Sequence, residues 1–214
     1  MSAAVRVALI DYRAGNLTSV RKALTAVGAE VSTPERPADL ASAQALVVPG
    51  VGHFDATRVL DDTWRDAIRG FIAASGPVLG ICLGMQWLYQ GSAELPGAPG
   101  LGVFDGECFR LPSNPAPASG EPAATVKVPH VGWNALAIQR SDRILEGVAN
   151  QAQVYFTHSY AAPLTADTVA ATTHGTPFAS VVQRGSVAGV QFHPEKSGPV
   201  GLQILRNFLA MGRS

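Results

Sequence analysis

The sequence has little of what marks nucleic-acid-binding or membrane proteins. Its 16 basic and 16 acidic residues cancel, and charged residues make up only 15% of the 214, so the composition offers no electrostatic footprint for a polyanion or a charged membrane. There is no apolar run near the roughly 20 residues that a membrane-spanning helix needs, and we expect neither a leader nor an anchor. The hydrophobic content of 47% is instead typical of a core-forming protein.

Cysteine is equally scarce. The only two, Cys82 and Cys108, lack the paired spacing of zinc ligands or redox motifs. The five histidines never fall at metal-ligand intervals with an acid or thiol, so we expect no metal and no cofactor. Both thiols should stay reduced, which indicates a cytoplasmic protein. Cys108 lies in an apparent strand over 103–110, where we expect a packed thiol.

Apolar strand-like runs alternate with helical patterns, which is typical of a mostly parallel α/β sheet. We expect one domain over 1–214, with an open, mostly parallel central sheet flanked by helices, a nucleophile elbow and additional antiparallel strands. Residues 111–125, rich in proline and alanine, predict a mobile surface loop. The expected strands are 5–11, 45–48, 77–81, 154–159, 169–173, 178–183 and 187–192, and the expected helices are 17–27, 64–74, an amphipathic turn over 85–89, and 200–211.

The most informative segment is Gly-Ile-Cys-Leu-Gly-Met-Gln over 80–86. Glycines flank Cys82 on both sides, as a sharp strand-to-helix turn requires, because side chains beside a strained nucleophile would clash. A cysteine at a helix start lies at the positive end of the helix dipole, which favours the thiolate. The segment predicts a cysteine nucleophile, although a buried structural cysteine beside a glycine is the commoner case.

A second block, far downstream, supplies the partners that such a nucleophile needs. A thiol requires a base, and the base requires a group that fixes its orientation. His193 and Glu195 provide both types, separated by one proline and placed at the end of the expected strand 187–192. A surface histidine beside a solvated acid is the usual fate of such a pair, but its combination with the cysteine turn favours a catalytic site.

With these two blocks the chain resembles a known family, the class I glutamine amidotransferases. Their hallmark is a G-x-C-x-G turn followed far downstream by His-Pro-Glu. More narrowly, the chain is similar to the glutaminase subunits of imidazole glycerol phosphate synthase. That resemblance rests on blocks spread over nearly the whole length: DYRAGNL at 11–17, PGVGHF at 49–54, the cysteine turn, PHVGWN at 129–134, YFTHSY at 155–160 and the HPEKS ending at 193–197.

The resemblance implies hydrolysis of L-glutamine to glutamate and ammonia through a cysteine thioester, with Cys82 as nucleophile, His193 as proton shuttle and Glu195 holding the imidazole. The backbone N–H after the nucleophile is placed to stabilise the oxyanion. A second donor would come from the 50–52 loop, whose first peptide must reorient before its N–H faces the site. The expected oxyanion and loop residues are Leu83, Gly50, Val51 and Gly52, and the expected substrate-binding residues are Gln86, Glu94, His158, Ser159 and Tyr160.

The chain shows no P-loop and no basic phosphate cradle, so nothing in it is expected to bind a phosphorylated ribosyl substrate. Such a glutaminase therefore needs a separate synthase to use its ammonia. The resemblance implies a heterodimer with a (β/α)₈-barrel cyclase subunit, which receives neutral NH₃ through its interior and forms imidazole glycerol phosphate and AICAR in histidine biosynthesis. Arg13 stands where the family usually has glycine, so the first loop departs from the family pattern at this position. The expected interface residues are Asn16, Trp133, Asn134, Tyr155 and Lys196.

Three alternatives remain open. A glutaminase of another biosynthetic synthase would share the chemistry, although the 49–52 and 130–134 blocks argue against it. A cysteine hydrolase or peptidase that works alone would be active without a partner. A non-catalytic binding subunit would keep the fold, but the complete Cys82, His193 and Glu195 set argues against that.

Overall fold

The computed structural model describes residues 4–14, 17–114 and 125–212. Within these residues the largest sheet has eight strands, in the order β2-β1-β3-β4-β13-β12-β11-β8. The first five strands run parallel and the last three continue the sheet antiparallel, which confirms the predicted fold class. In sheet order the strands are β2 (Ala29–Ser32), β1 (Val5–Leu9), β3 (Ala45–Val48), β4 (Val78–Ile81), β13 (Val187–Val190), β12 (Thr176–Arg184), β11 (Thr168–His174) and β8 (Ala137–Ile138).

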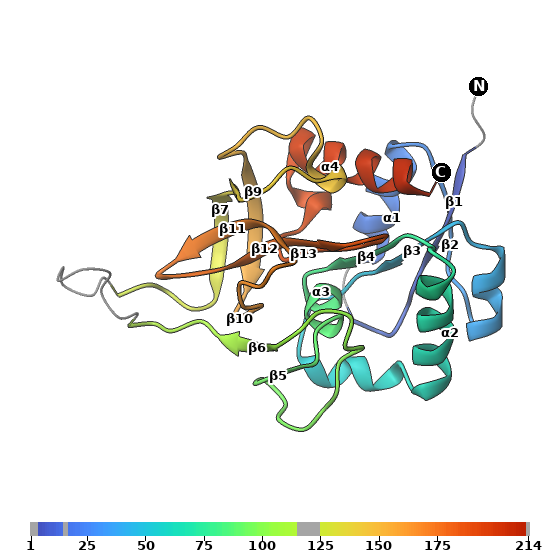
Figure 1. Ribbon diagram of the computed structural model, residues 1–214, viewed down its shortest axis with the longest axis horizontal. Coiled ribbons are helices and arrows are strands. Elements are labelled where there is room, and N and C mark those ends of the chain that lie inside the picture. Colours follow the sequence, from blue (N-terminus) through green and yellow to red (C-terminus); the bar gives the residue numbers. More distant parts are fainter. Residues whose placement is uncertain (1–3, 15–16, 115–124, 213–214) are drawn as a thin grey trace.

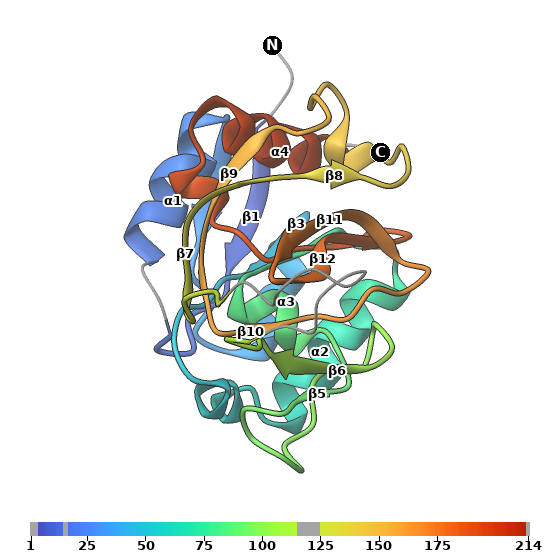
Figure 2. The ribbon, with the colours of Figure 1, turned by 90° about the vertical axis from the view of Figure 1, so that its left-hand side faces the viewer.

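Helices cover both faces of this sheet (Figures 1 and 2). α1 (Leu17–Ala26) and α4 (Gly198–Met211) lie on one face, and α2 (Asp62–Ala73) and α3 (Leu83–Trp87) lie on the other. Because successive side chains of a strand point to opposite faces, Leu9 packs with α1 and α4, whereas Ile10 packs with α2 and α3. The sheet therefore separates two apolar cores.

Local sequence explains where the helices begin and end. The side chain of Asp61 caps α2 by accepting the N–H of Trp64 at 3.1 Å. After α1 the chain turns at Gly28, whose φ of +94° favours glycine. Ile68 anchors α2 in the core beneath the sheet. In the described part of the chain, four short 3₁₀ helices complete the connections: η1 (Pro37–Ser42), η2 (Phe54–Val59), η3 (Arg143–Leu145) and η4 (Pro194–Lys196).

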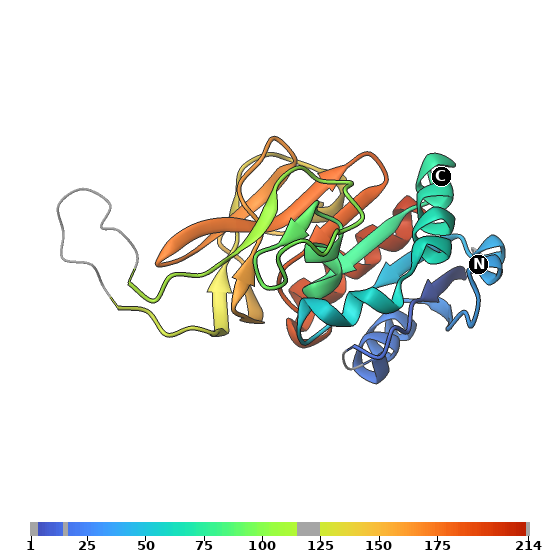
Figure 3. The same ribbon diagram turned by 90° about the horizontal axis from the view of Figure 1, so that it is seen from below.

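Two smaller sheets of the described residues lie beside the main one. β7 and β9 pair antiparallel and stand at the end of the molecule away from β1 and β2 (Figures 1 and 3). The other small sheet has the order β10-β6-β5. The five strands are β5 (Gly91–Ser92), β6 (Glu107–Arg110), β7 (His130–Ala135), β9 (Gln153–His158) and β10 (Tyr160–Ala161).

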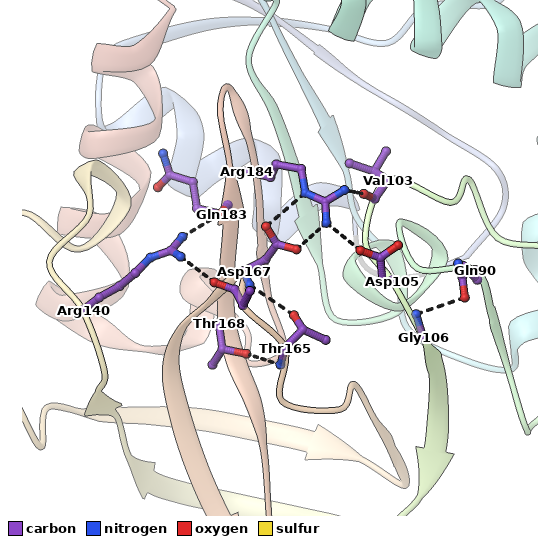
Figure 4. Close-up of polar contacts among 11 residues, drawn as sticks. Gln90, Val103, Asp105, Gly106, Arg140, Thr165, Asp167, Thr168, Gln183 and Arg184 are labelled. Atoms are coloured by element: carbon purple, nitrogen blue, oxygen red, sulfur yellow. Dashed lines mark hydrogen bonds and ion pairs between the residues drawn. The ribbon is translucent and has the colours of Figure 1, made fainter.

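Arg184, at the end of β12, ties the main sheet to the segment that precedes β6 (Figure 4). Its guanidinium binds the carboxylates of Asp167 at 2.6 Å and Asp105 at 2.8 Å, and it donates to the carbonyl oxygen of Val103 at 2.7 Å. The same stretch, between α3 and β6, carries Glu94. The Arg184 cluster therefore holds this stretch against the sheet.

Some local predictions were wrong. Only Glu107–Arg110 of the stretch 103–110 is a strand, because Gly106, with a φ of +97°, turns the chain just before it. The turn after Cys82 is not amphipathic, since residues 83–89 are all buried. Cys108 is fully buried, as expected. Most of the predicted 111–125 loop lies outside the described residues, so that loop and the single domain stay predictions.

Among the helices of the described residues, none is long and apolar enough to cross a membrane.

Candidate active site

Cys82 occupies a sharp turn between β4 and α3. Its φ of 51° and ψ of −106° are rare for a residue other than glycine, and such strain is typical of functional positions. A Cβ on Gly80 would lie 2.7 Å from the amide nitrogen of Met85, and one on Gly84 would collide with the carbonyl oxygen of Val48. Both flanking glycines are therefore required by space, and the predicted turn is present.

His193 and Glu195 form a buried pair close to this turn. Nδ1 of His193 lies 2.9 Å from Oε1 of Glu195, and the two side chains are 1% and 3% exposed. Burial on its own would lower the pKa of His193, but Cys82 and Glu195 outweigh it and hold that pKa well above its ordinary value. Nε2 of His193 has no hydrogen-bond partner in the described part of the chain. This nitrogen is free to exchange a proton at the site.

Two further groups contact the Cys82 sulfur. Nε2 of Gln191 lies 3.6 Å from Sγ, and the carbonyl oxygen of Thr157 lies 3.9 Å from it. Sequence reasoning missed Gln191. Its position two residues before His193 could have identified it, because alternate residues of an extended segment point to the same side.

The predicted substrate-binding residues line one pocket of about 210 Å³. Within it, Gln86 donates through Nε2 to the carbonyl oxygen of Tyr160 at 2.8 Å. The carboxylate of Glu94 is held in place, since one of its oxygens accepts the N–H of Phe54 at 2.8 Å. The arrangement offers carboxamide, carboxylate and backbone groups beside a thiol. The pocket is lined by Gly52, Cys82, Leu83, Gln86, Glu94, Pro129, Thr157, His158, Ser159 and Tyr160.

Two expected loop residues, Gly50 and Val51, are not among the residues that line this pocket. The carbonyl oxygen of Gly50 accepts a hydrogen bond of 3.3 Å from the backbone N–H of Leu83. The hydroxyl of the buried Tyr12 donates to the carbonyl oxygen of Pro49 in the same loop. The N–H that was predicted to stabilise an oxyanion is therefore occupied by the loop itself.

The predicted interface residues fall into three groups. Trp133 is 57% exposed, and its ring meets that of Tyr155 edge to face at 6.0 Å, with the Lys196 ammonium 5.7 Å from the Tyr155 ring. Asn134 turns its side chain inward instead, toward His130. Asn16 lies outside the described residues.

Arg13 has a φ of +61°, a conformation that glycine adopts most readily. The departure from the family glycine at this position therefore places an ordinary side chain in a strained backbone.

His158, which lines the pocket, belongs to a cluster of histidines that was not predicted as a group. Nδ1 of His130 lies 3.1 Å from Nε2 of His158, and His174 stacks on His130 at 4.1 Å. Burial lowers the pKa of His130 to about 4 and that of His158 to about 3, so both are neutral at pH 7. Among the described residues no group of three or more His, Cys, Asp or Glu side chains is arranged to hold a metal ion.

Known proteins share both the sequence and the fold. The imidazole glycerol phosphate synthase subunit HisH of Deinococcus radiodurans is 42% identical over 212 residues, covering 96% of this chain and 94% of that protein. The chloroplastic imidazole glycerol phosphate synthase hisHF of Arabidopsis thaliana is 42% identical over 209 residues, covering 95% of this chain and 34% of that protein. A crystal structure described as a glutamine amidotransferase has a TM-score of 0.72 at 21% identity, covering 97% of this chain and 99% of that one.

The family model for glutamine amidotransferase class-I matches residues 8–211. The chain therefore belongs to the class-I glutamine amidotransferase family.

Proposed function

We propose that this chain is the glutaminase subunit of an imidazole glycerol phosphate synthase. It hydrolyses L-glutamine to L-glutamate and ammonia, and a cyclase subunit consumes the ammonia. The observation that carries this proposal is the single pocket in which the strained Cys82 meets Gln86 and Glu94, beside the His193–Glu195 pair. The similarity to HisH subunits over almost the whole chain supports the choice of synthase.

In the first half of the reaction, the Cys82 thiolate attacks the side-chain carbonyl carbon of glutamine. The raised pKa of His193 keeps its imidazole protonated beside the thiolate, so it can deliver a proton to the departing nitrogen. Ammonia leaves and a thioester to Cys82 remains. Glu195 holds Nδ1 of His193 at 2.9 Å, which leaves Nε2 to carry the transferred proton.

In the second half, His193 is neutral because it has given up its proton. It takes a proton from water, and the resulting hydroxide attacks the thioester carbon. Collapse of this intermediate restores the Cys82 thiolate and the protonated His193 and releases the product, whose new carboxyl group gives its proton to solvent to leave glutamate. The pair is then ready for another glutamine.

Both tetrahedral intermediates place negative charge on an oxygen that needs N–H donors. Leu83 follows the nucleophile and would supply one donor, but it now donates to the carbonyl oxygen of Gly50. Rotation of the Gly50–Val51 peptide would release Leu83 and turn the N–H of Val51 toward the site. We therefore infer that the described conformation is a resting state with low activity.

The partner is a (β/α)₈-barrel cyclase that accepts neutral ammonia in the cytoplasm and unlocks the 50–52 loop when it binds its ribonucleotide. Trp133 is a suitable anchor for it, because large exposed aromatic side chains are typical interface hot spots. This chain corresponds to only 34% of the Arabidopsis protein named hisHF. That proportion leaves room for a second functional unit in one polypeptide.

The test uses both cysteines. Glutamate release is measured for the wild type, Cys82→Ala and Cys108→Ala, each with the cyclase subunit and its ribonucleotide substrate. Cys108 is fully buried, so its substitution controls for the loss of a thiol from the fold. We expect Cys82→Ala to abolish release and Cys108→Ala to retain it. Release by Cys82→Ala at the wild-type rate would refute the assignment.

A further inference from the structure

Gln191 is a fully buried polar residue that joins the nucleophile to a residue of the substrate pocket. Its Nε2 lies 3.6 Å from the sulfur of Cys82, and its Oε1 accepts a hydrogen bond of 3.1 Å from Gln86. Its backbone N–H donates to the carbonyl oxygen of Ser180 at 2.9 Å, which fixes the main chain beneath the site. The nitrogen of this buried carboxamide contacts the nucleophile and its oxygen contacts a pocket residue, so Gln191 is placed to influence both.

The orientation of the Gln191 carboxamide follows from its neighbours. Nε2 of Gln86 also faces the carbonyl oxygen of Tyr160 at 2.8 Å, and a carbonyl oxygen can only accept. The nitrogen of Gln86 must therefore face Tyr160, and its second hydrogen goes to Gln191. The oxygen of Gln191 must then face Gln86, which leaves its nitrogen facing Cys82.

The histidine cluster also donates to the carbonyl oxygen of Tyr160. Nδ1 of His158 lies 2.8 Å from the Tyr160 oxygen and must carry its hydrogen, so the neutral ring accepts at Nε2 from Nδ1 of His130. Nε2 of His130 then accepts from Nδ2 of Asn134 at 3.2 Å. The orientation of Asn134 is set independently, because its oxygen accepts the N–H of Ala135 at 2.8 Å. In this chain each group thus donates to the next one toward the pocket, from Asn134 through His130 and His158 to the carbonyl oxygen of Tyr160.

We propose that Gln191 is a further catalytic residue: one of its N–H groups stabilises the Cys82 thiolate, while its oxygen fixes the carboxamide of Gln86 for substrate. The inference rests on the proposed glutaminase function. Both hydrogens of Gln86 are used within the protein, so substrate meets the Gln86 oxygen and must offer it an N–H. A glutamine substrate has such donors in its amide and ammonium groups.

The direct test is the rate at which iodoacetamide alkylates Cys82 in the full chain, followed by mass spectrometry of the Cys82 peptide. Gln191→Met keeps the length of the side chain and removes both polar ends. Gln191→Glu keeps an acceptor for Gln86 but places a carboxylate beside the sulfur. Gln183→Met is the control, because Gln183 is also buried and bonds the N–H of Ile144, away from the site.

At pH 7 we expect alkylation to slow about tenfold in Gln191→Met, since a hydrogen bond to a charged group is lost. We expect a further slowing, of roughly tenfold, in Gln191→Glu, because like charges oppose the thiolate. Gln183→Met should react within about twofold of the wild type, since it leaves the hydrogen bonds at the sulfur intact.

A residue that only supports the fold would give the reverse order, because Gln191→Met loses more contacts than Gln191→Glu. That order, or equal rates in all chains, overturns the proposal. Should Gln191→Met fail to fold by circular dichroism, the near-isosteric Gln191→Glu decides the question alone. Glutamate release by the wild type with its partner is measured in parallel. The expected alkylation order without any glutamate release would refute the glutaminase function and leave the contact with the nucleophile standing.

Discussion

The backbone N–H of Leu83 donates to the carbonyl oxygen of Gly50 across 3.3 Å. This hydrogen bond occupies the donor that follows Cys82, where an oxyanion would form. An N–H that is already paired within the protein cannot stabilise a developing charge without first losing its partner. In the proposed site the loop therefore obstructs one oxyanion donor, while the proposed catalytic side chains Cys82, His193 and Glu195 are already in place.

Gly50→Ala is expected to abolish the response to the cyclase. A Cβ at this position would lie 2.9 Å from Cβ of Leu83 and would overlap the hydroxyl of Tyr12, so the 50–52 loop must be displaced, and the N–H of Val51 with it. Partner-stimulated glutamate release should fall at least about a hundredfold, the typical cost of one oxyanion donor. Gly70→Ala in α2, where a Cβ meets nothing within 4 Å, is the control and should retain activity. Normal stimulation of Gly50→Ala would contradict the role of the loop.

Tyr12→Phe should loosen the same loop. Its hydroxyl donates to the buried carbonyl oxygen of Pro49, and an unsatisfied buried acceptor costs about 1–3 kcal/mol of unfolding free energy. We expect lower stability in urea unfolding and a higher rate of glutamate release without the partner. Tyr89→Phe provides the matched control, since the buried Tyr89 hydroxyl has no hydrogen-bond partner among the described residues. Equal losses of stability in both variants would argue against the contact with Pro49.

Glu195→Gln should lower kcat on the order of a thousandfold, because the amide cannot support a protonated imidazole and favours the wrong tautomer. Glu195 helps to raise the pKa of His193, so the variant should also lose activity at a lower pH on the alkaline side of its profile. Glutamate release is measured from pH 6 to pH 10 in the complex. Glu146→Gln, at an exposed position, serves as the control. An unchanged alkaline limb would show that Glu195 does not set the protonation of His193.

Acid should destabilise the fold through the histidine cluster. The pKa of His130 is lowered to about 4 and that of His158 to about 3 by burial, whereas unfolded histidine titrates near 6.5. Below pH 6.5 the unfolded state therefore binds more protons, and the free energy of unfolding should fall by several kcal/mol as the pH drops toward 4. Urea unfolding between pH 7 and pH 4.5 measures this loss. His130→Phe should show a shallower dependence, and an equally steep one would contradict the assignment.

Trp133→Ala should weaken the complex with the cyclase. Truncation of an aromatic anchor at an interface typically costs about 2 kcal/mol or more, which corresponds to roughly a thirtyfold rise in Kd. Leu164→Ala is the matched control, because Leu164 is 49% exposed but lies outside the predicted interface. Isothermal titration calorimetry with the isolated cyclase measures both variants. Equal affinities for the two variants would place the interface elsewhere.

Much of the fold could be predicted because its elements are locally encoded. The run 45–48 is uniformly apolar and forms β3 with the predicted bounds, and Gly28 follows α1 as expected. The prediction of an amphipathic turn over 85–89 was wrong, because the polar side chain of Gln86 does not face solvent. Its side chain is instead buried and hydrogen-bonded to Tyr160 and Gln191, and tertiary contacts of this kind leave no periodic signal.

In the candidate site, too, locally encoded features could be predicted and tertiary contacts could not. Cys82, His193 and Glu195 could be singled out because a thiol, an imidazole and a carboxylate have defined chemical roles at those spacings. The histidine pair could not, since it depends on the register of β7 and β9, which sets His130 directly opposite His158. The inward turn of Asn134 depends on the same register. Pairing register between distant strands cannot be obtained from spacing alone.

The most direct test of the central claim is the rate of glutamate release from glutamine by this chain, alone and with the cyclase subunit and its ribonucleotide substrate. If the Gly50 carbonyl holds Leu83 in the resting chain, release should be low alone and should rise at least about a hundredfold in the complex, as one oxyanion donor is restored. Equal release in both conditions, or none in either, would contradict a partner-gated glutaminase.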